Sequence, residues 1–358
     1  MDWRNFRLSK RLELSGDTVE AIYSKIAEID AVKNTFQLNQ NLLPQTIERL
    51  TQSVIVTSTG ASNRIEGNRL TDSEVEALYR SMRIRSFKTR DEQEVVGYLE
   101  TLQTIFENYQ AMPVTESMIL QLHGMTLNYS DKDQKHKGHY KFGPNRVEAK
   151  DQSGNVVGII FEPTPPHLAQ KEIKELVSWH QWAQATRLKH PLILTANFLF
   201  EYLAIHPFQD GNGRTSRLLT NLMLLRSGYA FASLVSHERI IEQSKAEYYL
   251  ALNKTQQSWK SESENITPWL LYLFDVFLRQ AHEAHNLLQT DQFEYLLSEK
   301  QLAFWQWAKT QKEFSRKSAI DALQYPSRTV EDIIKKFLSM KKLERLGRGR
   351  GTRYRVIN

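Results

Sequence analysis

Twelve consecutive residues of the 358-residue chain have side chains suited to chemistry on a nucleotide. They run from His206 to Arg217 and have the sequence HPFQDGNGRTSR. His206 can accept a proton near neutral pH, and Asp210 can bind a hard cation such as Mg²⁺. The glycine-rich residues 211–213 let backbone N–H groups converge on an anion. The segment therefore predicts a site that binds a magnesium nucleotide and deprotonates an attacking hydroxyl.

The same segment is expected to form a loop that leads into the N-terminus of a helix. Apolar residues predict one helix over 191–205 and another from Thr215 to Arg226, which Gly228 ends. The helix dipole adds partial positive charge to the loop. Arg214 and Arg217 are three residues apart, so both can reach phosphate oxygens from one side of the helix. A lone histidine at a helix end, or a lone Asp-Gly turn, is usually structural, so the chemistry rests on the combination.

The segment resembles the signature of the Fic family, His-Pro-Phe-x-Asp/Glu-Gly-Asn-Gly-Arg-x-x-Arg, at every fixed position. Family members with this full form are protein adenylyltransferases, which move AMP from ATP to a Ser, Thr or Tyr hydroxyl of a target protein. The resemblance implies that His206 is the general base, that Phe208 anchors the loop and that Asp210 binds Mg²⁺. It also implies a phosphate-binding set made of Gly211, Asn212, Gly213, Arg214 and Arg217. An enzyme of the same fold that transfers a different group is the remaining alternative.

A second motif, SNRIEG at residues 62–67, resembles the inhibitory motif of the Fic family, Ser/Thr-x-x-x-Glu-Gly/Asn. Ser62 and Glu66 are four residues apart and share one helix face, and Gly67 completes the motif. The resemblance implies that Glu66 pairs with Arg217 and takes the arginine that the γ-phosphate of ATP needs. The alternative is a solvated glutamate beside a Gly-Asn turn. A chain with this glutamate could also remove AMP from a modified protein.

A hairpin is expected before the signature. Valine and isoleucine residues surround the turn sequence SGN at 153–155, and prolines 163, 165 and 166 follow. The resemblance makes this hairpin the flap that aligns a target peptide, although a plain surface hairpin is the alternative. If the hairpin is the flap, four residues next to its prolines would border the nucleotide: Ile160, Phe161, Glu162 and Pro163.

The segment KAEYYLALNKTQQ resembles the tyrosine pair that follows the signature in Fic proteins. Tyr248 is the first candidate for a contact with adenine and Tyr249 the second, while a position in the core is the alternative for either. Gln256 stands where some relatives have an asparagine. The runs LHGMTL (122–127) and GHYKF (138–142) also resemble the family, with Lys141 where arginine is common.

Apolar residues recur every three or four positions along most of the chain, which predicts a mainly α-helical protein. Helices are expected over 47–65, after a capping box at Thr71, over 91–109, 114–128 and 167–186, and from Thr267 to about Leu288. Residues 1–90 form an expected N-terminal helical region with the inhibitory motif. Residues 91–288 form an expected catalytic core with the Fic helical fold and its hairpin flap.

The composition changes after about residue 290. Three predicted helices and two short strands around a Gly/Arg tip indicate a winged helix-turn-helix domain over 291–358. Residues 335–358 hold nine basic residues and one acidic residue, Glu344. DNA is therefore an expected partner, with Ser327 to Leu338 as the recognition helix and Arg328 nearest to the DNA, although many such domains bind only protein. The chain could thus be a DNA-binding regulator whose Fic domain senses a nucleotide.

The overall composition is that of an ordinary globular protein, with 41% hydrophobic and 25% charged residues and a net charge of +6. The sequence contains no cysteine, which excludes disulfides and thiolate metal sites and favours the cytosol. The longest apolar stretch, Leu192 to Phe200, is too short to span a membrane. Besides ATP and Mg²⁺, the expected partners are a target protein and a second copy of the chain, since Fic proteins often pair.

Overall fold

The computed structural model divides the chain into two compact units, residues 1–285 (unit 1) and 286–358 (unit 2). It describes residues 2–38, 44–81, 87, 89–145, 147–150, 156–295, 298–347 and 349–357. Side chains are described for these residues, except 37–38, 44–46, 147–150, 156–160, 288–295, 299 and 350. No helix in the described ranges is long and apolar enough to cross a membrane.

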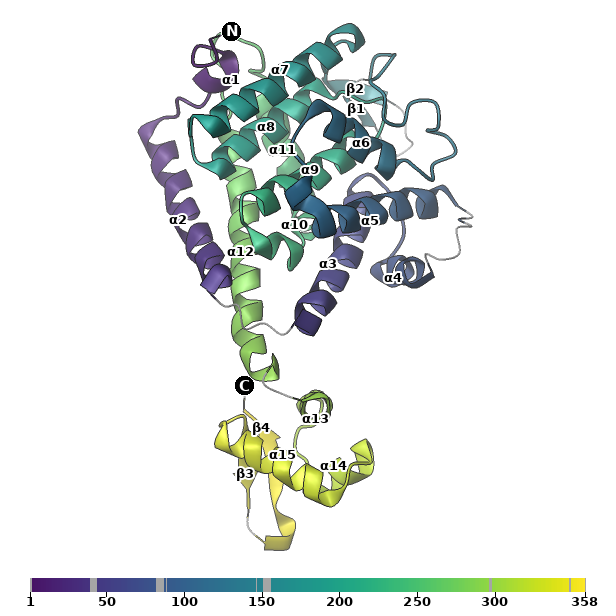
Figure 1. The fold of residues 1–358 in the computed structure, drawn as a ribbon, viewed down its shortest axis with the longest axis vertical. Coiled ribbons are helices and arrows are strands. Elements are labelled where there is room, and N and C mark those ends of the chain that lie inside the picture. The colour runs from purple at the N-terminus through teal and green to yellow at the C-terminus, as the bar shows by residue number, and fades with distance from the viewer. Residues whose placement is uncertain are drawn as a thin grey trace. The chain divides into compact units, whose positions relative to one another are not determined.

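Unit 1 is mainly helical, as the sequence predicted (Figure 1). Its helices are α1 (Arg7–Lys10), α2 (Gly16–Leu38), α3 (Pro44–Ile65), α4 (Asp72–Ser81), α5 (Arg90–Asn108), α6 (Glu116–Thr126), α7 (Pro166–Ala185), α8 (Pro191–Ile205), α9 (Asn212–Arg226), α10 (His237–Gln243), α11 (Lys245–Gln256) and α12 (Thr267–Tyr295). Two 3₁₀ turns, η1 (Tyr109–Ala111) and η2 (Ala230–Ser233), complete the helical segments.

Helices α8 and α9 form the centre of unit 1 and flank the signature loop. Every residue of α8 from Leu192 to Ile205 is buried, which explains why this helix is apolar on all sides. Almost all of α9 is buried as well, including Arg214 and Arg217. Helices α5, α6 and α7 pack around this pair. The loop between α8 and α9 is therefore held by two helices that the core fixes.

The capping box predicted at Thr71 is present at the start of α4. Thr71 and Glu74 cap α4 reciprocally: the Thr71 N–H donates to Glu74 Oε2 at 2.8 Å, and the Glu74 N–H donates to Thr71 Oγ1 at 3.3 Å. Thr89 and Glu92 form the same capping box at α5. One prediction was wrong, because α12 continues past residue 288 to Tyr295. No Gly or Pro lies between these positions to end the helix.

The predicted hairpin is present as strands β1 (Val147–Lys150) and β2 (Val156–Phe161), which pair antiparallel with Val147 opposite Phe161. The predicted turn at 153–155 lies outside the described residues, as does the side chain of Ile160.

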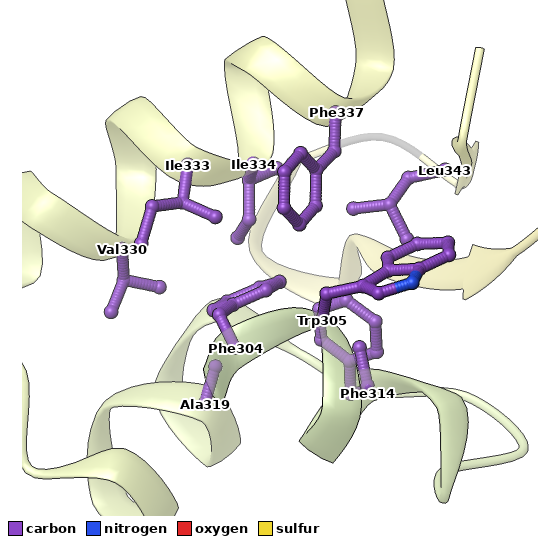
Figure 2. Close-up of a cluster of buried hydrophobic side chains, with 10 residues drawn as sticks. Phe304, Trp305, Phe314, Ala319, Val330, Ile333, Ile334, Phe337 and Leu343 are labelled. Carbon is purple, nitrogen blue, oxygen red and sulfur yellow. The ribbon is translucent and has the colours of Figure 1, made fainter. Parts of the chain in front are cut away.

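Unit 2 contains α13 (Glu299–Lys309), α14 (Arg316–Leu323), α15 (Ser327–Ser339), β3 (Leu343–Leu346), η3 (Gly349–Gly351) and β4 (Arg353–Val356). The strands pair antiparallel, and Phe314 forms a further backbone bridge to Tyr354. Figure 2 shows aromatic and aliphatic side chains of the three helices and β3 packed into one core. All these side chains belong to unit 2, so this unit has a core of its own. Burial of each large side chain contributes about 1.5–3 kcal/mol to its stability. Three helices and a hairpin occur where the sequence predicted them, and the winged-helix assignment stays a prediction.

Candidate active site

His206 ends α8 in the left-handed conformation, with φ 52° and ψ 61°. Its Nδ1 lies 3.2 Å from the carbonyl oxygen of Leu203. A carbonyl only accepts hydrogen bonds, so Nδ1 carries the hydrogen and Nε2 of the neutral ring has a free lone pair. The side chain lines a cavity of about 440 Å³. His206 therefore presents a potential base to that cavity.

The ionisation of His206 suits this role. Burial lowers its pKa to about 4, and the nearby positive charge of Lys141 acts in the same direction. The ring is therefore neutral at pH 7 and ready to accept a proton.

Two residues outside the signature, Lys141 and Asn145, hold the backbone of the signature loop. Asn145 donates from Nδ2 to the carbonyls of His206 and Phe208, at 3.1 and 2.6 Å. Lys141 donates from its backbone N–H to Pro207 and from Nζ to Ile205. These contacts hold the loop in one conformation before any ligand binds.

His123 of α6 is a further support, which the sequence analysis did not single out. Its ring stacks on Phe208 with centroids 3.7 Å apart, and Phe208 is fully buried, which confirms its role as the loop anchor. His123 Nδ1 accepts a hydrogen bond from the Gly138 N–H, so Nε2 carries the hydrogen and donates to the Asp210 carbonyl at 3.0 Å. Gly211 has φ +80°, and a Cβ there would lie 3.4 Å from the His123 ring. The resemblance of LHGMTL and GHYKF to the family was the one signal for this support.

The cavity brings part of the predicted site together, and Ser62, Gly67, Arg214 and Arg217 are not among its described lining residues. Its lining residues are Glu66, Leu203, His206, Gln209, Asp210, Gly211, Asn212, Gly213, Tyr248, Tyr249, Leu252, Asn253 and Gln256. Both candidate tyrosines border it. Tyr248 is buried and packs edge to face on Trp269 and Tyr272, while Tyr249 is 42% exposed. Tyr248 is thus both a core residue and a wall of the cavity.

The cavity contains residues that the sequence analysis left out. Leu203, Gln209, Leu252 and Asn253 line it without belonging to a predicted set. Leu252 and Asn253 follow Tyr249 at the helical spacing of three and four residues, which places them on the same face of α11. That spacing was the available signal for both.

Glu66 and Arg217 form a close ion pair, with Glu66 Oε1 2.7 Å from Arg217 Nη2. Ser62 binds the same guanidinium twice: its Oγ accepts from Nε at 2.8 Å and its carbonyl accepts from Nη2 at 2.9 Å. Burial opposes ionisation of Glu66, but the charge and hydrogen bond of Arg217 outweigh it and lower its pKa. Ser62 lies in the last turn of α3 and Glu66 directly follows this helix, so the pairing that the resemblance implied is present.

The Glu66 carboxylate lies at the N-terminus of α9. A Cβ at residue 213 would lie 2.2 Å from Glu66 Oε1, so only glycine leaves room for this carboxylate. Free N–H groups and the helix dipole make such a position favourable for anions. A side-chain anion of the protein therefore stands where the phosphates were predicted to bind.

The C-terminal end of α3 is fastened to the helices on the tyrosine side of the cavity. Arg64 donates from Nε and Nη2 to the two oxygens of Glu242, at 2.6 and 3.0 Å. Lys245 donates from Nζ to the carbonyl of Ile65 at 2.7 Å. Glu66 and then Gly67 follow this end. These contacts fix the last turn of α3, directly before Glu66.

Asp210 has its side chain 40% exposed at the cavity and accepts a hydrogen bond from the Gly211 N–H at 2.6 Å. Burial opposes its ionisation, but the charge of Arg214 and the Gly211 hydrogen bond lower its pKa. Within the described ranges, no group of three or more histidine or carboxylate side chains could hold a metal ion. One carboxylate with phosphate and water oxygens is nevertheless a normal Mg²⁺ ligand set, so Asp210 fits that ion.

Comparison with known proteins decides the family of this site. Residues 113–224, which include α6 to α9 and the whole signature, match the Fic/DOC family. The chain contains a Fic domain.

Relatives of the Fic domain include three animal proteins with named activity. Protein adenylyltransferase fic-1 of Caenorhabditis elegans is 29% identical over 194 residues, which are 53% of this chain and 34% of that protein. Protein adenylyltransferase Fic of Nematostella vectensis is 28% identical over 200 residues, 54% of this chain and 41% of that protein. That of Drosophila mojavensis is 29% identical over 213 residues, 59% of this chain and 37% of that protein. The chain thus spans about a third to two fifths of the length of these curated relatives.

Solved structures share the fold. A Fic family protein from Desulfovibrio desulfuricans has a TM-score of 0.63 and 24% identity, over 94% of this chain and 96% of that one. A Fic domain containing signaling protein from Bacteroides thetaiotaomicron has a TM-score of 0.57 and 25% identity, over 74% of this chain and 95% of that one. The helical Fic fold predicted for the core is therefore confirmed.

The described flap residues predicted to border the nucleotide do not line the cavity in this structure. Phe161, Glu162 and Pro163 are not among the described residues that line the cavity. Phe161 instead packs near Trp259, with ring centroids 5.3 Å apart. Their contact with a bound nucleotide, like that of Ile160, stays a prediction.

Proposed function

We propose that this chain is a protein adenylyltransferase that Glu66 holds in an inhibited state. The observation that carries the proposal is that a neutral His206 faces the same cavity as the anion-binding N-terminus of α9. The names of the relatives of the Fic domain support AMP as the transferred group.

In the proposed complex, ATP fills the cavity with its adenine near Tyr248 and Tyr249. The phosphates take the place of the Glu66 carboxylate at the N-terminus of α9, where Arg214 and Arg217 can bind the β- and γ-phosphates. Asp210 would hold Mg²⁺, which neutralises phosphate charge when bound.

The transfer exchanges one phosphorus–oxygen bond for another. The hydroxyl oxygen of the target attacks the α-phosphorus, while His206 Nε2 takes the hydroxyl proton. The bond from the α-phosphorus to the oxygen that bridges it to the β-phosphate breaks, and pyrophosphate leaves. AMP remains on the target through a phosphodiester.

ATP labelled at different phosphates tests this reaction. The Glu66→Gly variant should transfer label from α-labelled ATP and none from γ-labelled ATP, to itself or to proteins of a lysate. The Glu66→Gly/His206→Ala double variant should transfer neither. Transfer of the γ-label would instead show phosphorylation, and the proposal would then be wrong.

Removal of AMP from a modified protein is a second candidate at the same site. Glu66 borders the cavity and its lowered pKa keeps it ionised at neutral pH, so it could orient a water that attacks the phosphodiester. The products would be AMP and the restored hydroxyl. Protein labelled beforehand with AMP should lose it to the wild type and keep it with Glu66→Gly.

DNA contact by unit 2 is a separate proposal. Unit 2 exposes four cations: Arg328 and Lys335 on α15, and Arg345 and Arg353 on the hairpin. Helix α15 is the last of the three helices of this unit and directly precedes the hairpin. If unit 2 is a winged helix, these cations can bind DNA phosphates. Full-length protein should shift a duplex at 50 mM salt and release it at 200 mM, and Arg328→Ala/Arg345→Ala should weaken the shift. No shift at 50 mM salt would oppose the proposal.

A further inference from the structure

Four charged side chains form a closed ring beside the cavity. Arg90 Nε lies 2.6 Å from Glu94 Oε1, and Glu94 Oε2 lies 3.3 Å from Arg214 Nη1. Arg214 Nη2 lies 3.4 Å from Asp210 Oδ1, and Asp210 Oδ2 lies 3.6 Å from Arg90 Nη2. Positive and negative groups alternate around the ring. Arg90 and Glu94 belong to α5, outside the signature, the inhibitory motif and the residues that match the Fic family.

Arg214 depends on this ring for its charge balance. Its side chain is 2% exposed, and its Nε and Nη1 make no hydrogen bond to any described residue. A buried guanidinium needs an opposite charge close by, because burial removes its hydration. Glu94 supplies that charge from a side chain that is itself 9% exposed.

Glu94 is held in place from two directions. The capping box of Thr89 and Glu92 fixes the first turn of α5. Arg90 and Glu94 are four residues apart on this helix, so their side chains can meet. Arg90 then binds the outer oxygen of Glu94, which leaves the inner oxygen for Arg214. Asp210, the other carboxylate near Arg214, is the one that fits Mg²⁺, so Glu94 is the anion that can stay with Arg214 when a cation binds.

We propose that Glu94 is a positioning residue that holds the Arg214 guanidinium in place for the β-phosphate of a nucleotide, and that Arg90 supports it. This inference rests on the proposed function, in which Arg214 binds polyphosphate. Loss of the Glu94 charge leaves Asp210 as the single carboxylate among the described residues within ion-pair distance of Arg214. Affinity should then fall for nucleotides with a β-phosphate and stay unchanged for those without one.

The test compares nucleotides in the Glu66→Gly background, where Arg217 has lost its ion pair with Glu66 and keeps its hydrogen bonds to Ser62. Glu94→Gln keeps the shape of the side chain and removes its charge, and Glu107→Gln on the exposed face of the same helix is the matched control. Calorimetric titration should show about tenfold weaker ADP binding for Glu94→Gln, because a displaced Arg214 loses a hydrogen bond to the charged β-phosphate. AMP and adenosine affinities should change less than about twofold. Glu107→Gln should match the parent for all three ligands.

Two results of this titration would overturn the inference. Equal loss of ADP and adenosine affinity would show a purely structural role, and unchanged ADP affinity would show no role, so either result overturns the inference. If Glu94→Gln does not fold, Arg90→Gln at the half-exposed outer position should weaken ADP alone by about two- to fivefold. If the Glu66→Gly parent binds ADP and transfers no AMP, the proposed function fails while the positioning role of Glu94 still stands.

Discussion

Glu66 Oε1 lies 2.7 Å from Arg217 Nη2, although 151 residues separate the two in the chain. The pair places an anion of the protein at the N-terminus of α9, and it occupies the last arginine of the signature. ATP and Glu66 therefore compete for one arginine and one helix end. This competition gives the first expected result.

Glu66→Gly should raise AMP transfer by about tenfold or more, because a partly buried charge-assisted hydrogen bond is worth about 1.5–3 kcal/mol. The measurement is the rate of label incorporation from α-labelled ATP. The rate of Glu66→Gln, which keeps a weaker hydrogen bond to Arg217, should lie between the rates of Glu66→Gly and the wild type. Equal rates for all three proteins would remove the inhibitory role of Glu66.

The pH dependence of transfer should follow His206. Because burial lowers its pKa to about 4, the base is already deprotonated at pH 6. The kcat of Glu66→Gly at saturating ATP and Mg²⁺ should therefore stay level between about pH 8 and 6 and fall only toward pH 4. A decline centred near pH 6.5, the ordinary value for histidine, would contradict the burial of this ring.

His180 gives a matching prediction for stability. It is buried beside Phe198, neither ring nitrogen has a hydrogen-bond partner among the described residues, and burial lowers its pKa to about 4. The unfolded chain binds this proton below about pH 6.5 and the folded chain does not, so stability is lost as pH falls from 6.5 to 4. The loss should be about 2–3 kcal/mol from this group. In His180→Phe, denaturant unfolding should show a smaller loss over the same window, and an unchanged pH dependence would argue against this assignment.

The parts of the site that the sequence predicted are the parts with a local pattern. The loop from His206 to Arg217 holds its chemistry in twelve residues, and Ser62 and Glu66 share a helical spacing. The apolar run of α8 likewise predicted a buried helix before the loop.

The missed parts depend on contacts between distant segments. No spacing connects Glu94 with Arg214, and no composition shows that His123 would donate to the carbonyl of Asp210. Such side chains act on the backbone or on a partner's charge, so their residue types alone do not reveal them. The length of α12 was missed for another reason, because the end of a helix without Gly or Pro leaves no clear signal.

The ion pair between Arg64 and Glu242 should help to hold the end of α3, and with it Glu66, in the inhibitory position. Arg64 forks onto both oxygens of Glu242, and with Lys245 it fixes the end of α3 two residues before Glu66. Glu242→Gln should loosen this end and raise AMP transfer about two- to fivefold, since a partly exposed pair is worth up to about 1 kcal/mol. The rise should vanish in the Glu66→Gly background, where no inhibitory carboxylate remains to be released. Glu76→Gln, which removes the exposed Glu76–Arg80 pair on α4, is the control and should leave transfer unchanged. A rise with Glu242→Gln that persists in Glu66→Gly would place its effect outside the inhibitory contact.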